Sequence, residues 1–269
     1  MLTGQRSWDL KVRRAEQHLD EVKAAMAAYA STTPYRAIRV RQPKGQRDVW
    51  LYRLEMTEGP DPMLPVIIGD CLYGLRSALD HLAVAMTPRK RRANAAFPVE
   101  TTDPWQKDAA GNFVYPDARR DSFMSKVQGM PAEAIEMIKT AQPYQRQNSE
   151  LETLSLISRL ENADKHRTPI SIAYGVMDAR SVVRARGDII TQGTDGFRPD
   201  GAEIAKFGFP GHAAPRESEV TVEVTGTPSV AIKVSGIDGY FTMPDSLEIL
   251  VGWTRDSAIP ELGPFTRPD

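Results

Sequence analysis

The longest apolar stretch of the chain, residues 61–88, has the period of an α-helix. Its apolar side chains recur at steps of three and four residues and therefore form one broad stripe. Asp61 can cap the N-terminus and Pro62 is tolerated in the first turn, whereas Pro88 disfavours helical geometry at the residue before it. The opposite side carries few charges, so we expect this helix to be buried on both sides. Its polar line consists of Asp70, Gly74, Ser77 and His81.

Helical patterns recur on either side of this stretch. Residues 7–29 carry apolar side chains at alternating steps of four and three, as in a packed bundle helix, with Ser7 as the predicted cap. A short helix is predicted over residues 131–140, and a capping box predicts another over residues 149–164. Between them, residues 94–130 have no clear period, and we expect an irregular excursion that packs on the bundle through its aromatic side chains.

A period of two, which is typical of β-strands, appears in two parts of the chain. Residues 35–56 hold two strand-like segments around a Pro/Gly turn and predict a hairpin. From Ile170 onward, strand-like segments alternate with turns. There we expect a hairpin at residues 220–234, a strand at residues 247–253 and a loop at residues 190–215.

These patterns predict an α+β protein. An N-terminal helical bundle with an inserted basic β-hairpin would be followed by a β-rich C-terminal part. The predicted bundle comprises residues 1–169, with the hairpin at residues 35–56, and the β-rich region comprises residues 170–269 and packs on the bundle.

Composition narrows the class of protein. The chain has 269 residues, of which 41% are hydrophobic and 26% are charged, enough for a substantial core. The net charge of −1 provides no global field typical of nucleic-acid or membrane proteins. The single cysteine, Cys71, excludes an internal disulfide and fits the apolar stripe. Because no apolar run is long enough to span a bilayer, we predict no membrane partner and a cytoplasmic location.

The charge is nevertheless uneven, because the predicted hairpin is basic and its cations alternate with aromatic residues. Such a surface can contact phosphates and stack bases. The side chains predicted to bind nucleic acid there are Arg39, Arg41, Lys44 and Arg47. The alternative is a solvated edge hairpin that its charges protect from aggregation. A second basic run, Pro88–Arg92, would extend the same surface or form an ordinary exposed loop.

Two histidines follow acidic residues near predicted helices, in Asp80-His81 and in Asp164-Lys165-His166. A neighbouring carboxylate orients a histidine and raises its basicity. If the two helices pack face to face, these groups would form an acid–base site or, alternatively, a buried hydrogen-bond network.

Metal chemistry has weaker support. The chain has no His-x-x-x-His, Glu-x-x-His or Cys-x-x-Cys motif, so we predict no metal and no cofactor. A mononuclear site remains as the alternative, with ligands drawn from Asp70, His81, Asp164 and His166.

The segment Arg76-Ser-Ala-Leu-Asp-His81 resembles the Arg-x(4–6)-His signature of HEPN domains, small helical bundles that often cleave RNA as dimers. The resemblance implies that Arg76 and His81 act on the ribose 2′-hydroxyl and the phosphate of RNA, in a homodimer. Many members have Asn or Asp after the arginine and Tyr two places past the histidine, where this chain has Ser77 and Ala83. In a straight helix Arg76 and His81 lie about 140° apart, and Arg76 would instead pair with Asp80.

A second resemblance covers about residues 62–170. The ordered landmarks LRSALDHLA, AFPVE, AQPYQ and NADKHR are similar to those of an uncharacterised family of bacterial and phage proteins. This resemblance does not imply an enzymatic activity. It implies one functional or structural unit formed by Arg76, Asp80, His81, Asp164, Lys165 and His166.

We therefore predict a HEPN-like nucleic-acid-processing protein, a metal-independent endoribonuclease. In this hypothesis His81 or His166 is the general base, Arg76 or Lys165 holds phosphate, and Asp80 or Asp164 orients a histidine. Two alternatives stay open. One is a non-catalytic binding or assembly module in which the Asp/His cluster is a structural network, and the other is a small-molecule enzyme with a pocket between bundle helices.

Overall fold

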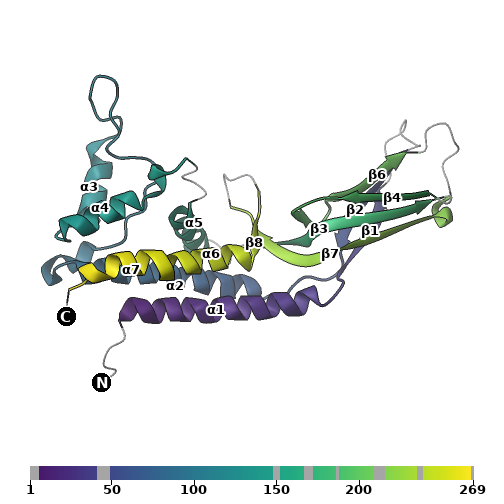
Figure 1. Ribbon diagram of the computed structural model, residues 1–269, viewed down its shortest axis with the longest axis horizontal. Coiled ribbons are helices and arrows are strands. Elements are labelled where there is room, and N and C mark those ends of the chain that lie inside the picture. The colour runs from purple at the N-terminus through teal and green to yellow at the C-terminus, as the bar shows by residue number, and fades with distance from the viewer. Residues whose placement is uncertain are drawn as a thin grey trace.

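Helices occupy one half of the elongated molecule and β-strands occupy the other (Figure 1). The computed structural model describes residues 6–40, 49–147, 152–166, 172–185, 188–208, 216–234 and 239–267. Within these ranges the helices and the antiparallel sheets confirm the predicted α+β class. None of the described helices is both long enough and apolar enough to cross a membrane.

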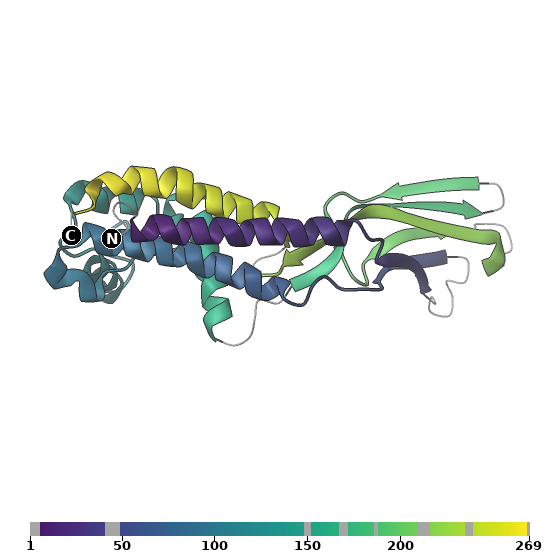
Figure 2. The ribbon, with the colours of Figure 1, turned by 90° about the horizontal axis from the view of Figure 1, so that it is seen from below.

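Three long helical segments run side by side along the helical half (Figure 2). They are α1 (Ser7–Ala30), α2 (Leu64–Met86) and a C-terminal segment formed by α6 (Asp245–Trp253), a π-helical turn (Thr254–Ala258), α7 (Ile259–Leu262) and a 3-10 turn (Gly263–Phe265). Helices α1 and α2 approach closely at Gly74, where an added Cβ would lie 3.3 Å from the Cβ of Ala15. The absence of a side chain at this position therefore sets the spacing of the two helices.

Helix α2 has the apolar stripe expected from its sequence, and every leucine within it is buried. Asp61 lies ahead of the helix, and its carboxylate accepts a hydrogen bond from the amide of Met63 at 2.8 Å. It therefore closes the turn before α2 and does not cap the helix. The expectation of burial on both sides is wrong at Asp70 and Tyr73, both of which are exposed. At the start of α1, Arg6 occupies the cap position without a side-chain hydrogen bond, so Ser7 is not the cap.

Shorter helices pack around α2. They are η1 (Arg89–Asn94), α3 (Asp117–Lys126), α4 (Ala132–Thr140), η2 (Pro143–Gln145) and α5 (Thr153–His166). Helix α4 was predicted. Helix α3 was not, because Phe123 is its one buried residue and leaves no period to detect. Phe97 and Trp105 pack on the bundle as expected, whereas Phe113 is exposed.

Two antiparallel sheets pack face to face in the other half. The first has the order β1–β2–β6, and the second has the order β4–β3–β7–β8 with β5 also paired to β3. The hairpin predicted at residues 35–56 is confirmed by the pairing of β1 with β2. The strands are β1 (Tyr35–Val40), β2 (Val49–Met56), β3 (Ile172–Ala185), β4 (Asp188–Gly193), β5 (Phe197–Pro199), β6 (Glu203–Gly208), β7 (Val220–Ile232) and β8 (Phe241–Met243); a 3-10 turn (Glu217–Glu219) precedes β7.

Three expectations for the C-terminal part are wrong. Residues 190–215 contain β5, β6 and part of β4, so this stretch is not simply a loop. Residues 220–232 form one continuous strand, because β3 pairs with β7 on both sides of the Gly226-Thr227-Pro228 segment that resembled a turn. Residues 247–253 are helical, because Leu247, Leu250 and Val251 are buried at helical spacing.

The long β3–β7 ribbon connects the two halves. At one end, Val230 and Ile232 belong to a hydrophobic core shared with α1, α2 and α6. At the other end, Val183 belongs to the core between the sheets, together with Trp50 and Phe207. The division of the chain at residue 169 and the description of the hairpin as an insertion in a bundle stay predictions.

Candidate functional site

Arg76 and Asp80 of α2 bind both polar main-chain atoms of Phe97. Nη2 of Arg76 lies 3.0 Å from Oδ1 of Asp80 and donates to the carbonyl oxygen of Phe97 at 2.8 Å. The amide of Phe97 donates to the same Asp80 oxygen at 2.9 Å. The ion pair therefore fixes a segment that has no regular secondary structure of its own.

Arg76 and His81, the two residues of the HEPN-like signature, do not come together. Helix α2 is continuous from Leu64 to Met86, so no break lets the two side chains converge. Arg76 is engaged by Asp80 and Phe97, and His81 is half-buried without a hydrogen bond to another described residue. Their catalytic roles stay predictions.

The second acidic–histidine pair lies at the end of α5. Asp164, Lys165 and His166 belong to that helix, but their side chains lie outside the part of the chain that the structure describes. Glu161, one turn earlier, is only 3% exposed, so α5 places an acidic group inside the bundle. Among the described residues, no group of three histidine, cysteine, aspartate or glutamate side chains is placed to share a metal ion.

The basic hairpin does not present its aromatic residues to a ligand. Trp50 is 2% exposed, Tyr52 stacks on Phe207 between the sheets, and the guanidinium of Arg39 lies 3.7 Å from the centre of the Trp50 ring. These rings are therefore not available for base stacking. Arg41, Lys44 and Arg47 lie outside the described residues.

The two basic segments do not form one surface. The hairpin belongs to the sandwich, whereas Arg89–Asn94 follows the end of α2 at the opposite end of the molecule (Figure 2). The long helix between them separates them by more than 30 Å, given about 1.5 Å per residue.

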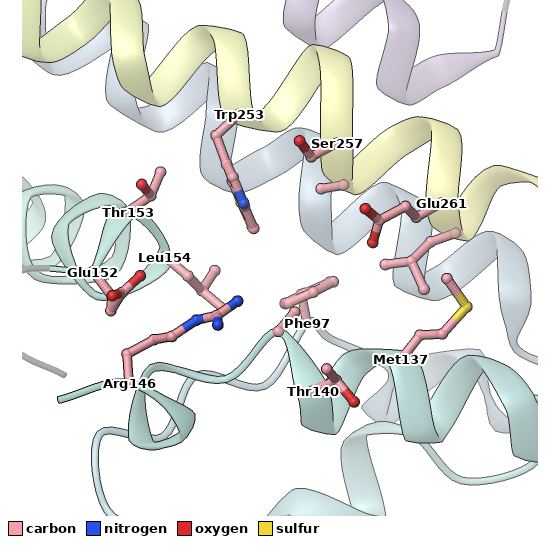
Figure 3. A pocket seen from close by; sticks show the side chains of 13 residues that line it. Phe97, Met137, Thr140, Arg146, Glu152, Thr153, Leu154, Trp253, Ser257 and Glu261 are labelled. Atoms are coloured by element: carbon pink, nitrogen blue, oxygen red, sulfur yellow. The ribbon is translucent and has the colours of Figure 1, made fainter.

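A pocket of about 450 Å³ lies beside Phe97 (Figure 3). Its walls come from the Phe97 segment, α4, the start of α5, and the C-terminal helix from Trp253 to Leu262. Phe97, Met137, Leu154 and Trp253 give it an apolar lining. The volume is that of a site for a small organic molecule, and about half of the lining is polar.

The wall at Phe97 is held from a second side by Gln142. Its buried side chain donates to the carbonyl of Pro98 at 3.0 Å and accepts from the amide of Glu100 at 2.8 Å. Burial also raises the pKa of the Glu100 carboxyl above its usual range, although Lys126 and Arg119 partly oppose the shift. The landmark segments around Asp80, Phe97 and Gln142 are thus hydrogen-bonded to one another beside the pocket.

Polar groups surround the apolar lining. Arg146 extends from the segment after η2, and Glu261 projects from α7 on the other side (Figure 3). Ser257 belongs to the π-helical turn, a feature often found at functional sites. Sequence reasoning missed these residues. A helical spacing does relate Trp253, Ser257 and Glu261, but the segment was interpreted as a strand that ends at Trp253.

No protein-family model matches the chain, and comparisons with curated proteins and with solved structures found no match either. The site is therefore interpreted from its own geometry.

Proposed function

We propose that the helical half of this protein is a binding module that holds a small organic molecule in the pocket beside Phe97. The observation that carries the proposal is a pocket with a rigid wall. Phe97 is hydrogen-bonded through both its amide and its carbonyl, and its neighbours Pro98 and Glu100 are bound by Gln142. A wall fixed in this way lowers the cost of ordering the site when a ligand binds.

The proposal gives the Arg76–Asp80 pair a structural role. Nη2 of Arg76 and the carboxylate of Asp80 bind each other and the main chain of Phe97, while Nη1 of Arg76 is buried and has no acceptor among the described residues. A HEPN-like ribonuclease would need Arg76 to contact phosphate, and the burial of this guanidinium against Phe97 supports the binding module over the ribonuclease.

A fluorescence titration with 8-anilinonaphthalene-1-sulfonate tests the proposal. The dye combines aromatic rings, which suit Met137 and Trp253, with one anionic group, which suits Arg146. We expect saturable binding at one site. Ser257→Trp, which places a large side chain in the pocket lining, should abolish this binding.

Ser122→Trp is the matched control because Ser122 is exposed on α3 and does not line the pocket. This variant should bind the dye like the wild type. Absence of saturable binding, or equal binding by the Ser257→Trp protein, would contradict the proposal.

A further inference from the structure

Three charged side chains line the pocket: Arg146, Glu152 and Glu261. None of them makes a side-chain hydrogen bond or an ion pair with another residue in the described ranges, and Arg146 and Glu261 are exposed to solvent. Other exposed charges of the protein are paired, as in Lys23–Glu248 and Arg255–Glu16. The pocket therefore offers one cation and two carboxylates that a ligand can neutralise.

Arg146 and Glu261 lie on opposite sides of the cavity. Arg146 reaches in beside Leu154, with Glu152 on the same side, and Glu261 projects from the C-terminal helix across the pocket (Figure 3). Trp253 extends from the same helix toward Arg146 and Phe97, and its indole N–H has no hydrogen-bond acceptor among the described residues. A ligand that fills the space meets the donors of Arg146 and Trp253 together with the carboxylate of Glu152 at one end, and the carboxylate of Glu261 at the other.

We infer that the ligand is a zwitterion of about dipeptide size with an apolar side chain. Its carboxylate would pair with Arg146, its ammonium group with Glu261, and its apolar part would pack on Met137 and Trp253. Polyanions such as nucleotides are disfavoured, because a single cation faces two carboxylates. This inference rests on the proposed function, since it names the ligand class of the same pocket.

Four forms of one dipeptide separate the contributions of the charges. They are Phe-Leu, its N-acetyl form, its C-terminal amide, and the form capped at both ends. Isothermal titration calorimetry at pH 7 would give each dissociation constant. We expect free Phe-Leu to bind most tightly and each cap to weaken binding roughly tenfold, which corresponds to the loss of one charge-assisted hydrogen bond.

Variants assign each end of the ligand to a residue. In Arg146→Gln, free Phe-Leu and its amide should bind equally, because the carboxylate has lost its partner. In Glu261→Gln, free Phe-Leu and its N-acetyl form should bind equally. Arg89→Gln removes an exposed charge in η1 that does not line the pocket, and should preserve the wild-type order of affinities.

The outcomes distinguish this inference from the proposed function. If the doubly capped dipeptide binds as tightly as the free one, or if no form binds while the dye does, the zwitterion is wrong and the binding pocket stands. If neither the dye nor any dipeptide binds, the proposed function fails as well. Equal effects of Arg146→Gln on all four ligands would also overturn the inference.

Discussion

The carboxylate of Asp80 accepts a hydrogen bond from the amide of Phe97 at 2.9 Å, although the two residues are 17 positions apart in the sequence. Arg76 completes the contact by donating to the carbonyl of Phe97. Since the side chain of Phe97 is part of the pocket wall, the shape of the pocket depends on polar residues of α2 that do not line it.

Asp80→Ala should lower the free energy of unfolding by about 1–3 kcal/mol, because it leaves the amide of Phe97 and one donor of Arg76 without their acceptor. Asp70→Ala on the same helix is the control. Asp70 is exposed and makes no side-chain hydrogen bond or ion pair with another described residue, so its loss should cost less than about 0.5 kcal/mol. Urea denaturation measures both values. Equal stability of the two variants would contradict a structural role for Asp80.

Gln192 of β4 joins the two sheets through its side-chain amide, which donates to the carbonyl of Lys206 at 2.9 Å and accepts from the amide of Lys206 at 3.0 Å. Gln192→Met preserves the length of the side chain and removes both bonds. We expect faster hydrogen exchange at the Lys206 amide and a loss of about 0.5–1.5 kcal/mol in stability. Gln192→Glu can still accept the amide hydrogen and should protect Lys206 partly. Unchanged exchange in Gln192→Met would show that this contact does not hold the sheets together.

Gly175 of β3 leaves room for the main chain of β5. An added Cβ would lie 2.0 Å from the carbonyl oxygen of Arg198, and backbone atoms cannot move aside as a flexible side chain can. Gly175→Ala should therefore separate β5 from β3 and destabilise the protein by about 1–3 kcal/mol. At Gly59 an added Cβ meets no atom within 4 Å, so Gly59→Ala should be neutral or slightly stabilising. Thermal unfolding of the two variants makes the comparison, and equal midpoints would contradict it.

The thiol of Cys71 should not react with Ellman's reagent in the folded protein. Cys71 is fully buried on α2, and burial raises its pKa from 9.0 to about 12, which removes the reactive thiolate. Ser122→Cys adds an exposed thiol on α3 and should bring one rapidly labelled group at pH 8. Rapid labelling of the wild-type protein without denaturant would show that the α1–α2 interface opens readily.

The same shift predicts a dependence of stability on pH. Between pH 9 and about 12 the unfolded chain loses the Cys71 proton while the folded chain retains it, so this residue makes stability fall as the pH rises through that window. Cys71→Ala should reduce the slope of stability against pH in this range.

The sequence by itself determined the elements whose pattern is local. Residues 7–30 and 64–86 repeat their apolar side chains every three or four positions, and the same spacing that predicts a helix also identifies its buried stripe. The strand pairing at residues 35–56 could also be predicted from the sequence, because two segments with strand-like alternation of side chains and the Pro/Gly turn between them lie within one short stretch. The residue types of Arg76 and Asp80 make them candidate site residues in the sequence. Their pairing follows from helical geometry, because residues four positions apart lie on the same face of a helix.

Only the tertiary structure decided which other segments these helices and strands contact. The partner of Arg76 and Asp80 is the main chain of Phe97, and a main-chain partner leaves no signature in residue type. Residues 247–253 resembled a strand because a short apolar run suits either a strand or a buried helix, and their packing against α1, α2 and α5 selected the helix. That choice extends the helix to Glu261 and brings both Trp253 and Glu261 to the pocket. Periodicity reports which face of a segment avoids water, whereas a binding site depends on which segments meet, and that is settled by packing between residues far apart in the chain.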